Sequence, residues 1–502
     1  MVMSKPTELF LSSSLRSIEA EFAEQPLMQR AGLAAADLAG ELATDRNRPI
    51  LILAGPGNNG GDAFEAARLL RERFFLVAVV FAGDPARLPK DAAAAYRRFV
   101  EAGGTTTAYI PDGQHWGLIV DGLFGIGLTR APEGRYADWI DAANRLAERD
   151  ACPLLALDCP SGLNADTGTA FTPSIRASHT VSFIFAKPGL CTADGPDHCG
   201  QISIADLGIT TTQAADGAIV TTEAFRPYLK PRPRNSHKGS FGNAGILGGN
   251  HSMLGAALLA GRAALKLGAG RVYLGLLDPM APPVDSLQPE LMLRSADALL
   301  HTELDALACG PGLGTSDEAA GVVEQSLKST TPIVLDADAL NILAGSPKLQ
   351  SQAEKRNAAT LLTPHPAEAA RLLGVSVGDV QHDRISSAKE LARRYSSHVA
   401  LKGCGTVVAS PNGQWWINTS GNPGMSSAGM GDVLTGLIAA LLAQGWPAEE
   451  ALLAGVHLHG AAADKLVGQG IGPVGLTAGE VVDTARQVFN AWLDQRGCVA
   501  AL

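Results

Sequence analysis

The chain has 502 residues, of which 46% are hydrophobic and 18% are charged. This length exceeds what one hydrophobic core usually supports, so the composition predicts two domains with sizeable cores. The formal net charge of −10 argues against a general binder of nucleic acid or of anionic membrane surfaces.

The sequence also argues against export and membrane insertion. Its first residues lack a basic stretch followed by a long apolar core, and no uninterrupted apolar run of about 18 residues occurs. We therefore expect a soluble, cytoplasmic protein. The 7 cysteines are odd in number and form no C-x-x-C pair, which favours reduced, mostly buried thiols over disulfides or a zinc site. They are Cys152, Cys159, Cys191, Cys199, Cys309, Cys404 and Cys498.

In the first part of the chain, strand-like runs alternate with helical stretches, a pattern that predicts a parallel sheet covered by helices. The expected strands are 50–54, 75–82, 118–120, 154–157 and 179–185, and the clearest helices are 63–73 and 136–148. Residues 227–234 are then rich in proline and charge, as in a segment between domains.

The alternation restarts after this segment. Helix 254–267 and the strands 244–247, 272–276, 306–309, 333–335, 360–362 and 399–401 are expected. The sequence therefore predicts two doubly wound, three-layer α/β domains, with boundaries 1–225 and 226–502.

A glycine-rich motif follows the first expected strand. Gly55 to Gly60 satisfy G-x-G-x-x-G, the pattern of a dinucleotide-binding turn, although Asn58 to Asp62 are more polar than such a turn requires. Backbone amides there could approach an anion. Asp62 has two open interpretations, a helix N-cap or a ligand contact.

Oxygen-bearing side chains stand at three expected strand ends. Asn59, Asp121 and Ser161 could converge on a hard cation, because the carboxyl ends of parallel strands meet at one edge of a sheet. Taken singly, each residue is more typical of a turn.

Five motifs occur in order: LMQRAG (27–32), GNNGGD (57–62), DGLFGIGL (121–128), DCPSGLNADTG (158–168) and AKPGL (186–190). Together they resemble the NAD(P)H-hydrate epimerase domain over roughly residues 10 to 215. The resemblance implies a Rossmann-like domain that interconverts the R and S epimers of hydrated NADH or NADPH.

The same resemblance implies site residues. Potassium would be held by Asn59, Asp121 and Ser161. The substrate would contact Asn58, Asn59, Gly60, Gly61, Asp62, Gly125, Ile126, Gly127, Leu128, Thr129, Arg130 and Asp158.

Asp158, Ala63 and Lys187 also bear on the chemistry of this domain. Asp158 is our candidate for acid/base chemistry, the alternative being a cap for the following turn. Ala63 stands where this family usually has glycine, which affects substrate fit if the position needs positive φ and is harmless if the position is helical. Lys187 is a weaker candidate, because a lysine beside Pro188–Gly189 is more typical of a solvated loop.

A second glycine-rich motif, at 421–432, precedes an apolar run at 433–442 that predicts a buried helix. Gly429 and Gly431 would expose backbone amides to negative charge at the N-terminus of that helix. Asp432 is placed to deprotonate an attacking hydroxyl in phosphoryl transfer, although an N-cap aspartate would look the same in sequence.

Four further strand ends carry glycine or polar residues and should face the same side of the sheet: 308–314, 335–340, 362–368 and 401–406. With HKGSFG (237–242), these motifs resemble the ribokinase-like NAD(P)H-hydrate dehydratase domain over about residues 232 to 495. The resemblance implies that ADP or ATP, with magnesium, phosphorylates the hydroxyl of the S hydrate, and that phosphate then leaves.

Residue roles follow from this resemblance. Asp432 would be the base, and Ala256, Gly312, Gly314, His365 and Asp432 would line the substrate site. His365 could instead be a loop histidine bonded to its own turn. The nucleotide would contact Lys402, Gly403, Cys404, Gly405, Thr406, Ser426, Ser427, Ala428, Gly429, Met430 and Gly431.

Other readings stay open. Asp84 lies where a ribose-binding acid of a dehydrogenase is expected, and the C-terminal motif alone suits a sugar or vitamin kinase with an accessory nucleotide-binding domain. A non-enzymatic module predicts lost site residues. The expected partners are NADHX, NADPHX and ADP in a homo-oligomer, without nucleic acid or membrane. His457 and His459 are interpreted as packing residues, and Trp415–Trp416 as a hairpin arm.

Overall fold

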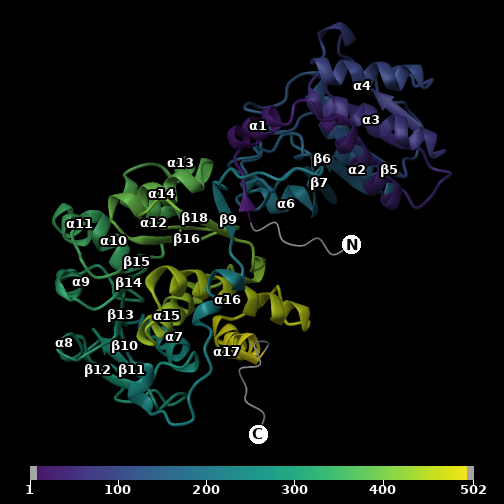
Figure 1. The fold of residues 1–502 in the computed structure, drawn as a ribbon. Helices are drawn as coiled ribbons and strands as arrows, with labels where there is room; N and C mark the ends of the chain where they lie inside the picture. Colours follow the sequence, from purple (N-terminus) through teal and green to yellow (C-terminus); the bar gives the residue numbers. More distant parts are fainter. Residues whose placement is uncertain (1–7, 495–502) are drawn as a thin grey trace. The chain divides into compact units, whose positions relative to one another are not determined.

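The computed structural model describes residues 8–494. The chain divides into two compact units, one ending at Ala218 and the other beginning at Ile219 (Figure 1). The expected boundary, after residue 225, falls slightly later in the chain. The assignment of one activity to each range stays a prediction.

The first unit contains a fully parallel sheet in the order β4-β3-β2-β5-β6-β7-β8, as the alternating pattern predicts. Its strands are β2 (Ile50–Ala54), β3 (Val77–Val80), β4 (Thr106–Thr107), β5 (Leu118–Gly122), β6 (Leu154–Leu157), β7 (His179–Phe183) and β8 (Gln201–Ala205). The short β1 (Glu8–Leu9) pairs with Ala218 and Gly217. The strand order reverses between β2 and β5, and such a switch point is where doubly wound sheets bind ligands.

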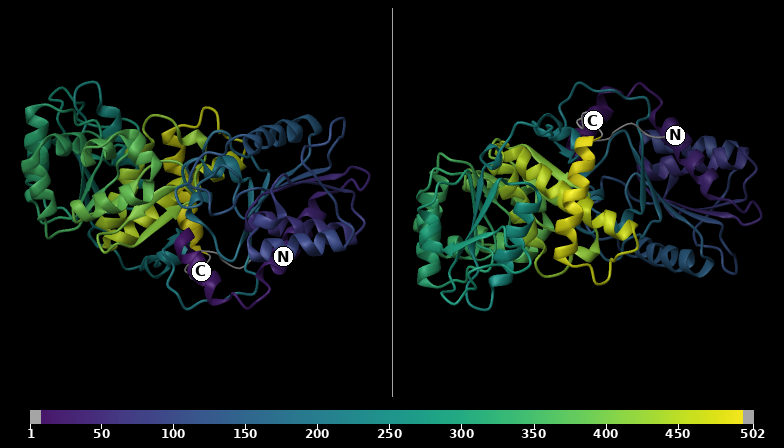
Figure 2. Two further views of the ribbon diagram at one scale, coloured as in Figure 1. Left: turned by 90° about the horizontal axis from the view of Figure 1, so that it is seen from above. Right: turned by 90° about the horizontal axis from the view of Figure 1, so that it is seen from below.

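Helices cover both faces of this sheet (Figure 2). They are α1 (Ser12–Glu21), α2 (Leu27–Leu42), α3 (Asn58–Glu72), α4 (Lys90–Glu101), α5 (Arg135–Asp150) and α6 (Gly195–Cys199). Because side chains alternate along a strand, Ile50 and Ile52 pack in the core with α2 and α3. Leu51 and Leu53 pack on the other face in the core that contains α5.

In the second unit the sheet runs in the order β12-β11-β10-β13-β14-β15-β16-β17-β18. The strands are β10 (Asn243–Gly248), β11 (Arg271–Leu276), β12 (Met292–Ser295), β13 (Ala306–Cys309), β14 (Ile333–Leu335), β15 (Thr360–Leu362), β16 (His398–Leu401), β17 (Thr406–Ala409) and β18 (Trp415–Asn418). Pairing is parallel from β12 to β16, and β17 and β18 add an antiparallel hairpin. The predicted Trp415–Trp416 arm is confirmed, and a second switch point lies between β10 and β13.

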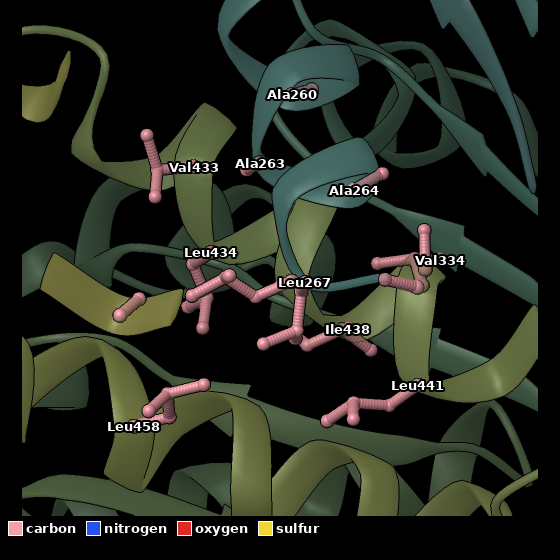
Figure 3. Packing of buried hydrophobic residues seen from close by; sticks show 14 of the residues in the cluster. Ala260, Ala263, Ala264, Leu267, Val334, Val433, Leu434, Ile438, Leu441 and Leu458 are labelled. Carbon is pink, nitrogen blue, oxygen red and sulfur yellow. The ribbon is translucent and has the colours of Figure 1, made fainter. Parts of the chain in front are cut away.

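The helices of this unit are α7 (Leu254–Lys266), α8 (Ala296–Leu300), α9 (Asp317–Lys328), α10 (Asp338–Gly345), α11 (Pro347–Glu354), α12 (Pro366–Leu373), α13 (Val377–His382), α14 (Arg384–Arg394), α15 (Met430–Ala443), α16 (Ala448–Gly468) and α17 (Ala478–Asp494). Small residues let α7 and α15 approach closely. Ala260 and Ala263 of α7 lie beside Val433 and Leu434 of α15 (Figure 3). A methyl group on Gly436 would lie 2.1 Å from the Ala260 carbonyl oxygen. This packing holds the start of α15 in place over the sheet.

Two composition-based predictions can be compared with this fold. No helix within residues 8–494 is long and apolar enough to cross a membrane. None of the cysteines in residues 8–494 forms a disulfide, and Cys159, Cys199 and Cys309 are buried whereas Cys404 is exposed. Cys498 lies outside the described residues.

Two candidate active sites

The first site lies at the switch point between β2 and β5. Residues after β2, β5 and β6 meet there, as expected from the parallel order. A methyl group on Gly125 would lie 2.8 Å from Asp158 Oδ2 and 3.6 Å from Asn59 Cγ. Glycine at position 125 therefore lets this loop lie directly against both polar side chains.

The polar residues of the first motif belong to a helix. Helix α3 begins at Asn58, five residues before the expected start at Ala63, and Gly57 is its N-cap. The N-cap interpretation of Asp62 is therefore wrong, because Asp62 lies in the second turn and is buried. Ala63 is helical and fully buried, so this position needs no positive φ.

Asp62 sits in an acidic environment. Burial raises its pKa well above the usual aspartate value, and the charges of Asp158 and Glu19 raise it further. Asp62 and Asn58 also line a cavity of about 630 Å³, which is bounded by α1, α2 and α4. This volume falls in the range of small-molecule sites.

The three candidate cation ligands form a buried group. Asp121 is fully buried, and its carboxylate accepts hydrogen bonds from Ser161 Oγ (2.7 Å), Ser161 N (2.8 Å) and Leu123 N (3.2 Å). Burial raises the pKa of Asp121 to about 6, although these hydrogen bonds lower it. Both polar side-chain atoms of Asn59 are buried without a hydrogen-bond partner in the described chain.

This group fits a monovalent cation with oxygen ligands. In residues 8–494 no lysine or arginine forms an ion pair with Asp121, and a buried carboxylate without a cationic partner is unfavourable. A cation would supply the missing charge and would give Asn59 a partner. No group of three or more His, Cys, Asp or Glu side chains suited to a metal occurs in the same residues, so this site differs from a conventional divalent one.

Asp158 follows β6 with φ of 65°, a conformation uncommon for a residue other than glycine. Its Oδ2 accepts from Ile126 N at 3.2 Å, in the Gly125–Arg130 loop. Lys187 Nζ donates to Asp158 Oδ1 at 2.6 Å. Asp158 therefore bonds across the site, and the interpretation as a cap for its own turn is not supported.

Lys187 contradicts the expectation of a solvated loop lysine. Only 1% of the side chain is exposed, so it is not a solvated loop charge. Its ammonium also donates to Ser182 Oγ at 2.7 Å and to the Phe183 carbonyl oxygen at 3.0 Å. The long apolar run of residues 183–186, directly before Lys187, was the available signal for burial.

The other predicted substrate-binding residues of the first unit take a smaller part in the hydrogen bonds of this site. Leu128 N donates to the Gly125 carbonyl oxygen at 3.2 Å, which closes a turn. Gly127, Thr129 and Arg130 are exposed at the surface of that loop. Gly60 and Gly61 pack tightly inside α3, where a methyl group on Gly60 would lie 2.0 Å from the Gly55 carbonyl oxygen.

The second site begins at the switch point between β10 and β13. Gly312 has φ of +61°, and a methyl group there would lie 3.1 Å from Ala256 Cβ. Gly314 N donates to Asp338 Oδ2 at 2.8 Å. The structure thus brings Ala256, Gly312 and Gly314 together, as the motifs predict.

His365 lies further along the same edge, as the N-cap of α12. Its Nδ1 accepts from Ala367 N at 3.1 Å, and its Nε2 lies 3.3 Å from Glu368 Oε1. This is the geometry of a histidine bonded to its own turn, although about half of the side chain remains exposed. Burial raises the pKa of Glu368 to about 7.

Helix α15 begins beside Lys402 and Asp336, which lie nearest to Gly431 in its first turn. Its N-cap, Gly429, has φ of +89°, and no side chain caps the helix. Asp432 is therefore the third helical residue and not the N-cap. Burial raises the pKa of Asp432 to about 6, with a further contribution from the charge of Asp336.

Lys402 connects the strand ends to this helix. Its Nζ donates to Asp336 Oδ1 at 2.7 Å, and a methyl group on Gly431 would lie 3.2 Å from Nζ. Gly403 N donates to Thr406 Oγ1 at 3.3 Å, which closes the intervening turn around Cys404 and Gly405. Ser426, Ser427 and Ala428 precede α15, and Ser427 Oγ donates to the Leu476 carbonyl oxygen at 3.1 Å.

Two histidines interpreted as packing residues behave differently from one another. His457 bonds to Asn418 Oδ1 at 3.1 Å and stacks on Trp492. His459 is buried, its Nε2 has no hydrogen-bond partner in the described chain, and burial together with the charge of Lys402 lowers its pKa to about 4. Asp84 caps a short turn by accepting a hydrogen bond from Ala86 N at 2.9 Å. This contact explains the presence of an aspartate at position 84 without a role in binding a ribose.

Each unit is thus a doubly wound α/β domain with acidic and glycine residues gathered at the carboxyl ends of its strands, the arrangement of a nucleotide-handling enzyme. Family models agree with this class: residues 24–189 match the YjeF-related protein N-terminus, and residues 244–484 match NAD(P)H-hydrate dehydratase. The chain belongs to the family of bifunctional NAD(P)H-hydrate repair enzymes.

Membership rests on whole-length relatives. The bifunctional NAD(P)H-hydrate repair enzyme of Escherichia coli (strain K12) is 38% identical, over 97% of this chain and 95% of the relative. That of Coxiella burnetii is 37% identical over 94% and 96%. A solved structure, the ADP/ATP-dependent NAD(P)H-hydrate dehydratase of Bacillus subtilis co-crystallised with ATP/Mg²⁺, is 35% identical over 55% of this chain and 98% of that one, with a TM-score of 0.49. The kinase alternative is not favoured.

Proposed function

We propose that the first unit interconverts the R and S epimers of hydrated NADH and NADPH, and that the second unit dehydrates the S epimer with ADP or ATP. Membership of the repair family over nearly the whole chain carries this proposal. Within the two ranges, 1–225 would be the epimerase and 226–502 the dehydratase. Each unit offers a partly buried carboxylate at the carboxyl edge of its sheet, Asp158 in the first unit and Asp432 in the second.

In the first unit, epimerisation inverts the ring carbon that bears the hydroxyl group. The bond from the ring nitrogen to that carbon can open, with its electron pair staying on the nitrogen, as the hydroxyl proton leaves and a carbonyl group forms; the nitrogen then closes the ring on the other face of the carbonyl and the proton returns to the oxygen. Asp158 is our candidate to take and return this proton. The contact between Lys187 and Asp158 supports the assignment, because the ion pair fixes one carboxylate oxygen and leaves Oδ2 beside the Gly125 loop. The substrate would contact Asn58 to Asp62 and Gly125 to Arg130.

Potassium is proposed for the first unit on the orphan amide of Asn59 and the unpaired charge of Asp121. Asn59, Asp121 and Ser161 would hold the ion. When bound, it would neutralise the buried carboxylate and stabilise negative charge on the neighbouring loop.

In the second unit, Asp432 would take the proton of the substrate hydroxyl as its oxygen attacks the terminal phosphoryl group. The raised pKa of Asp432 suits a base that works near neutral pH. Ala256, Gly312, Gly314 and His365 would line the substrate pocket. Lys402 to Thr406 and Ser426 to Gly431 would hold the nucleotide at the uncapped N-terminus of α15.

Magnesium is proposed to accompany the nucleotide, bound mainly by phosphate oxygens and water, because no cluster of three or more candidate side chains occurs in the described chain. When bound, it would neutralise phosphoryl charge. A homo-oligomeric, cytoplasmic enzyme without nucleic-acid or membrane partners stays a prediction.

Phosphate release tests the dehydratase proposal against the kinase alternative. We would incubate the full chain with S-NADHX and ADP and measure both free phosphate and dihydronicotinamide absorbance. The proposal predicts one phosphate for each dihydronicotinamide restored. A stable phosphorylated product, formed without recovery of the absorbance, would instead identify a kinase.

A further inference from the structure

A buried carboxylate links three elements of the second site. Asp336 directly follows β14, and its side chain is 1% exposed. Lys402, after β16, donates to Asp336 Oδ1 at 2.7 Å, and Thr435 Oγ1 of α15 donates to Oδ2 at 2.9 Å. One carboxylate therefore connects two strand ends to the helix that carries Asp432.

The electrostatics show that this contact is an ion pair. Burial alone would raise the pKa of Asp336, but the charge of Lys402 and hydrogen bonds from Lys402 and Thr435 lower it below its usual value. Burial correspondingly lowers the pKa of Lys402, whereas the charges of Asp336 and Glu368 raise it, with a net increase. Both partners are therefore ionised at neutral pH.

The backbone around Asp336 is specialised. Ala337, the next residue, has φ of 50°, in a region that residues other than glycine rarely adopt. Gly310 approaches so closely that a methyl group there would lie 1.8 Å from the Asp336 carbonyl oxygen. Strain of this kind persists where surrounding contacts fix a position, and it is concentrated at functional sites.

The ion pair determines where the ammonium lies. Lysine has a long, flexible side chain, and without Asp336 its charge would reach many positions. Here a methyl group on Gly431 would lie 3.2 Å from Lys402 Nζ and 3.5 Å from Asp336 Oδ2. Gly431 is the second residue of α15, and Asp432 follows it, so the ammonium stands beside the first turn of that helix.

We propose that Asp336 is a positioning residue for phosphoryl transfer, holding the Lys402 ammonium where the transferred phosphoryl group meets the N-terminus of α15. This inference rests on the proposed dehydratase function. It assigns Lys402 a contact with the transferred phosphoryl group instead of a role in anchoring the nucleotide. In the step, the bond from phosphorus to the leaving nucleotide oxygen breaks, and its electron pair stays on the nucleotide. The substrate hydroxyl oxygen forms the new bond, and its proton goes to Asp432. Lys402 is not consumed, since it donates hydrogen bonds to the phosphoryl oxygens.

The test compares Asp336→Asn, Lys402→Met and the double variant in the full chain, with S-NADHX and Mg-ADP. Asp336→Asn keeps the shape of the side chain but removes the charge that holds Lys402. We expect kcat to fall about 100-fold, the order that displacement of a catalytic group produces, with the KM for ADP changed by less than about 3-fold. Because Asp336 acts through Lys402, the double variant should be no slower than Lys402→Met.

A purely structural role would give a different pattern. Independent effects that multiply in the double variant, or a raised KM for ADP at unchanged kcat, would overturn the proposal. If Asp336→Asn does not fold, Thr435→Val replaces it in the same test. We expect Thr435→Val to lower kcat by a smaller factor than Asp336→Asn. Adding Thr435→Val to Lys402→Met should lower kcat no further. Failure of the wild-type chain to restore dihydronicotinamide would instead contradict the proposed function itself.

Discussion

At the residue scale, the state of a few buried carboxylates decides what each site can do. Asp121, Asp432 and Glu368 have pKa values raised mainly by burial, whereas Asp336 is held ionised by Lys402. Groups of one chemical type therefore take up protons over different pH ranges, as acid/base chemistry requires.

The raised pKa of Asp432 predicts a pH dependence of the dehydratase reaction. A base must be deprotonated to accept a proton, so kcat/KM should fall as the pH decreases through about 6. Asp432→Asn should lower kcat by about 10²- to 10⁴-fold, the usual contribution of a general base. The measurement is the pH profile of kcat/KM for the ADP-dependent reaction, in the wild-type chain and in the variant. If the residual activity of the variant still falls with decreasing pH as in the wild type, a group other than Asp432 is titrating.

The unpartnered amide of Asn59 predicts potassium-dependent stability of the first unit. Potassium chloride should raise the melting temperature of the wild-type chain above its value in choline chloride, by about 2–4 °C for each kcal/mol by which bound potassium stabilises the fold. Asn59→Leu loses an oxygen ligand but no hydrogen bond within the protein. The variant should keep its stability in choline chloride and lose the potassium shift; an equal shift in both proteins would refute the site.

At this scale the sequence motifs predicted where several polar residues lie, and the expectation was wrong for Lys187, whose burial depends on the fold. Asp158 and Asp121 were found because each follows an apolar strand at a predicted edge. Lys187 was misjudged, since its neighbours Pro188 and Gly189 are typical of loops, and only the three-dimensional fold shows Ser182 and Asp158 around its ammonium.

At the scale of elements, close packing of α15 against α7 positions Asp432. Gly436 is the point of closest approach, and a methyl group there would lie 2.1 Å from the Ala260 carbonyl oxygen. Backbone atoms cannot rotate away as side chains do. The helix would have to move, and the first turn of α15 would move with it.

Gly436→Ala should therefore destabilise the second unit, by about 1–3 kcal/mol or more, as overpacking of cores does. Gly321→Ala is the matched control, since Gly321 lies within α9 with nothing near the added methyl group. This second change should be neutral or should stabilise by up to about 1 kcal/mol through helix propensity. Denaturant unfolding of both variants measures the difference, and equal stabilities would contradict the packing argument.

Element predictions were accurate for buried strands and less so for helix starts. Strands β6, β13, β14 and β15 have the expected bounds, because short apolar runs between turn signals leave little choice. Helix α3 begins five residues before the expected position, since Asn58 to Asp62 read as a polar glycine loop. Tertiary contacts, including the approach of Gly60 to Gly55, override the low helix propensity of this segment.

At the scale of the whole molecule, the two proposed activities act on one substrate in sequence. The epimerase would supply the S hydrate that a stereospecific dehydratase consumes. Each unit has its own sheet, its own switch point and its own core. The residues assigned to the first candidate site all lie in the first unit, and those assigned to the second site all lie in the second unit.

If the two sites work independently, two variants that each lack one activity should complement one another when mixed. Asp158→Asn should lose epimerisation and Asp432→Asn should lose dehydration, so each alone fails to recover all of an R and S mixture. A mixture of the two variants should restore complete recovery, because the S hydrate can diffuse from one chain to another. Incomplete recovery in the mixture, with each single activity intact, would indicate direct transfer within one chain.

The most direct test of the account is recovery of dihydronicotinamide absorbance from a mixture of R- and S-NADHX, with ADP, ATP or no nucleotide. We expect complete recovery by the wild-type chain with at least one nucleotide, none without nucleotide, and recovery slowed by at least about 100-fold for Asp432→Asn. Asp158→Asn should stop once the initial S fraction is consumed. Nucleotide-independent recovery, or no recovery with either nucleotide, would contradict the assignment of two repair activities to this chain.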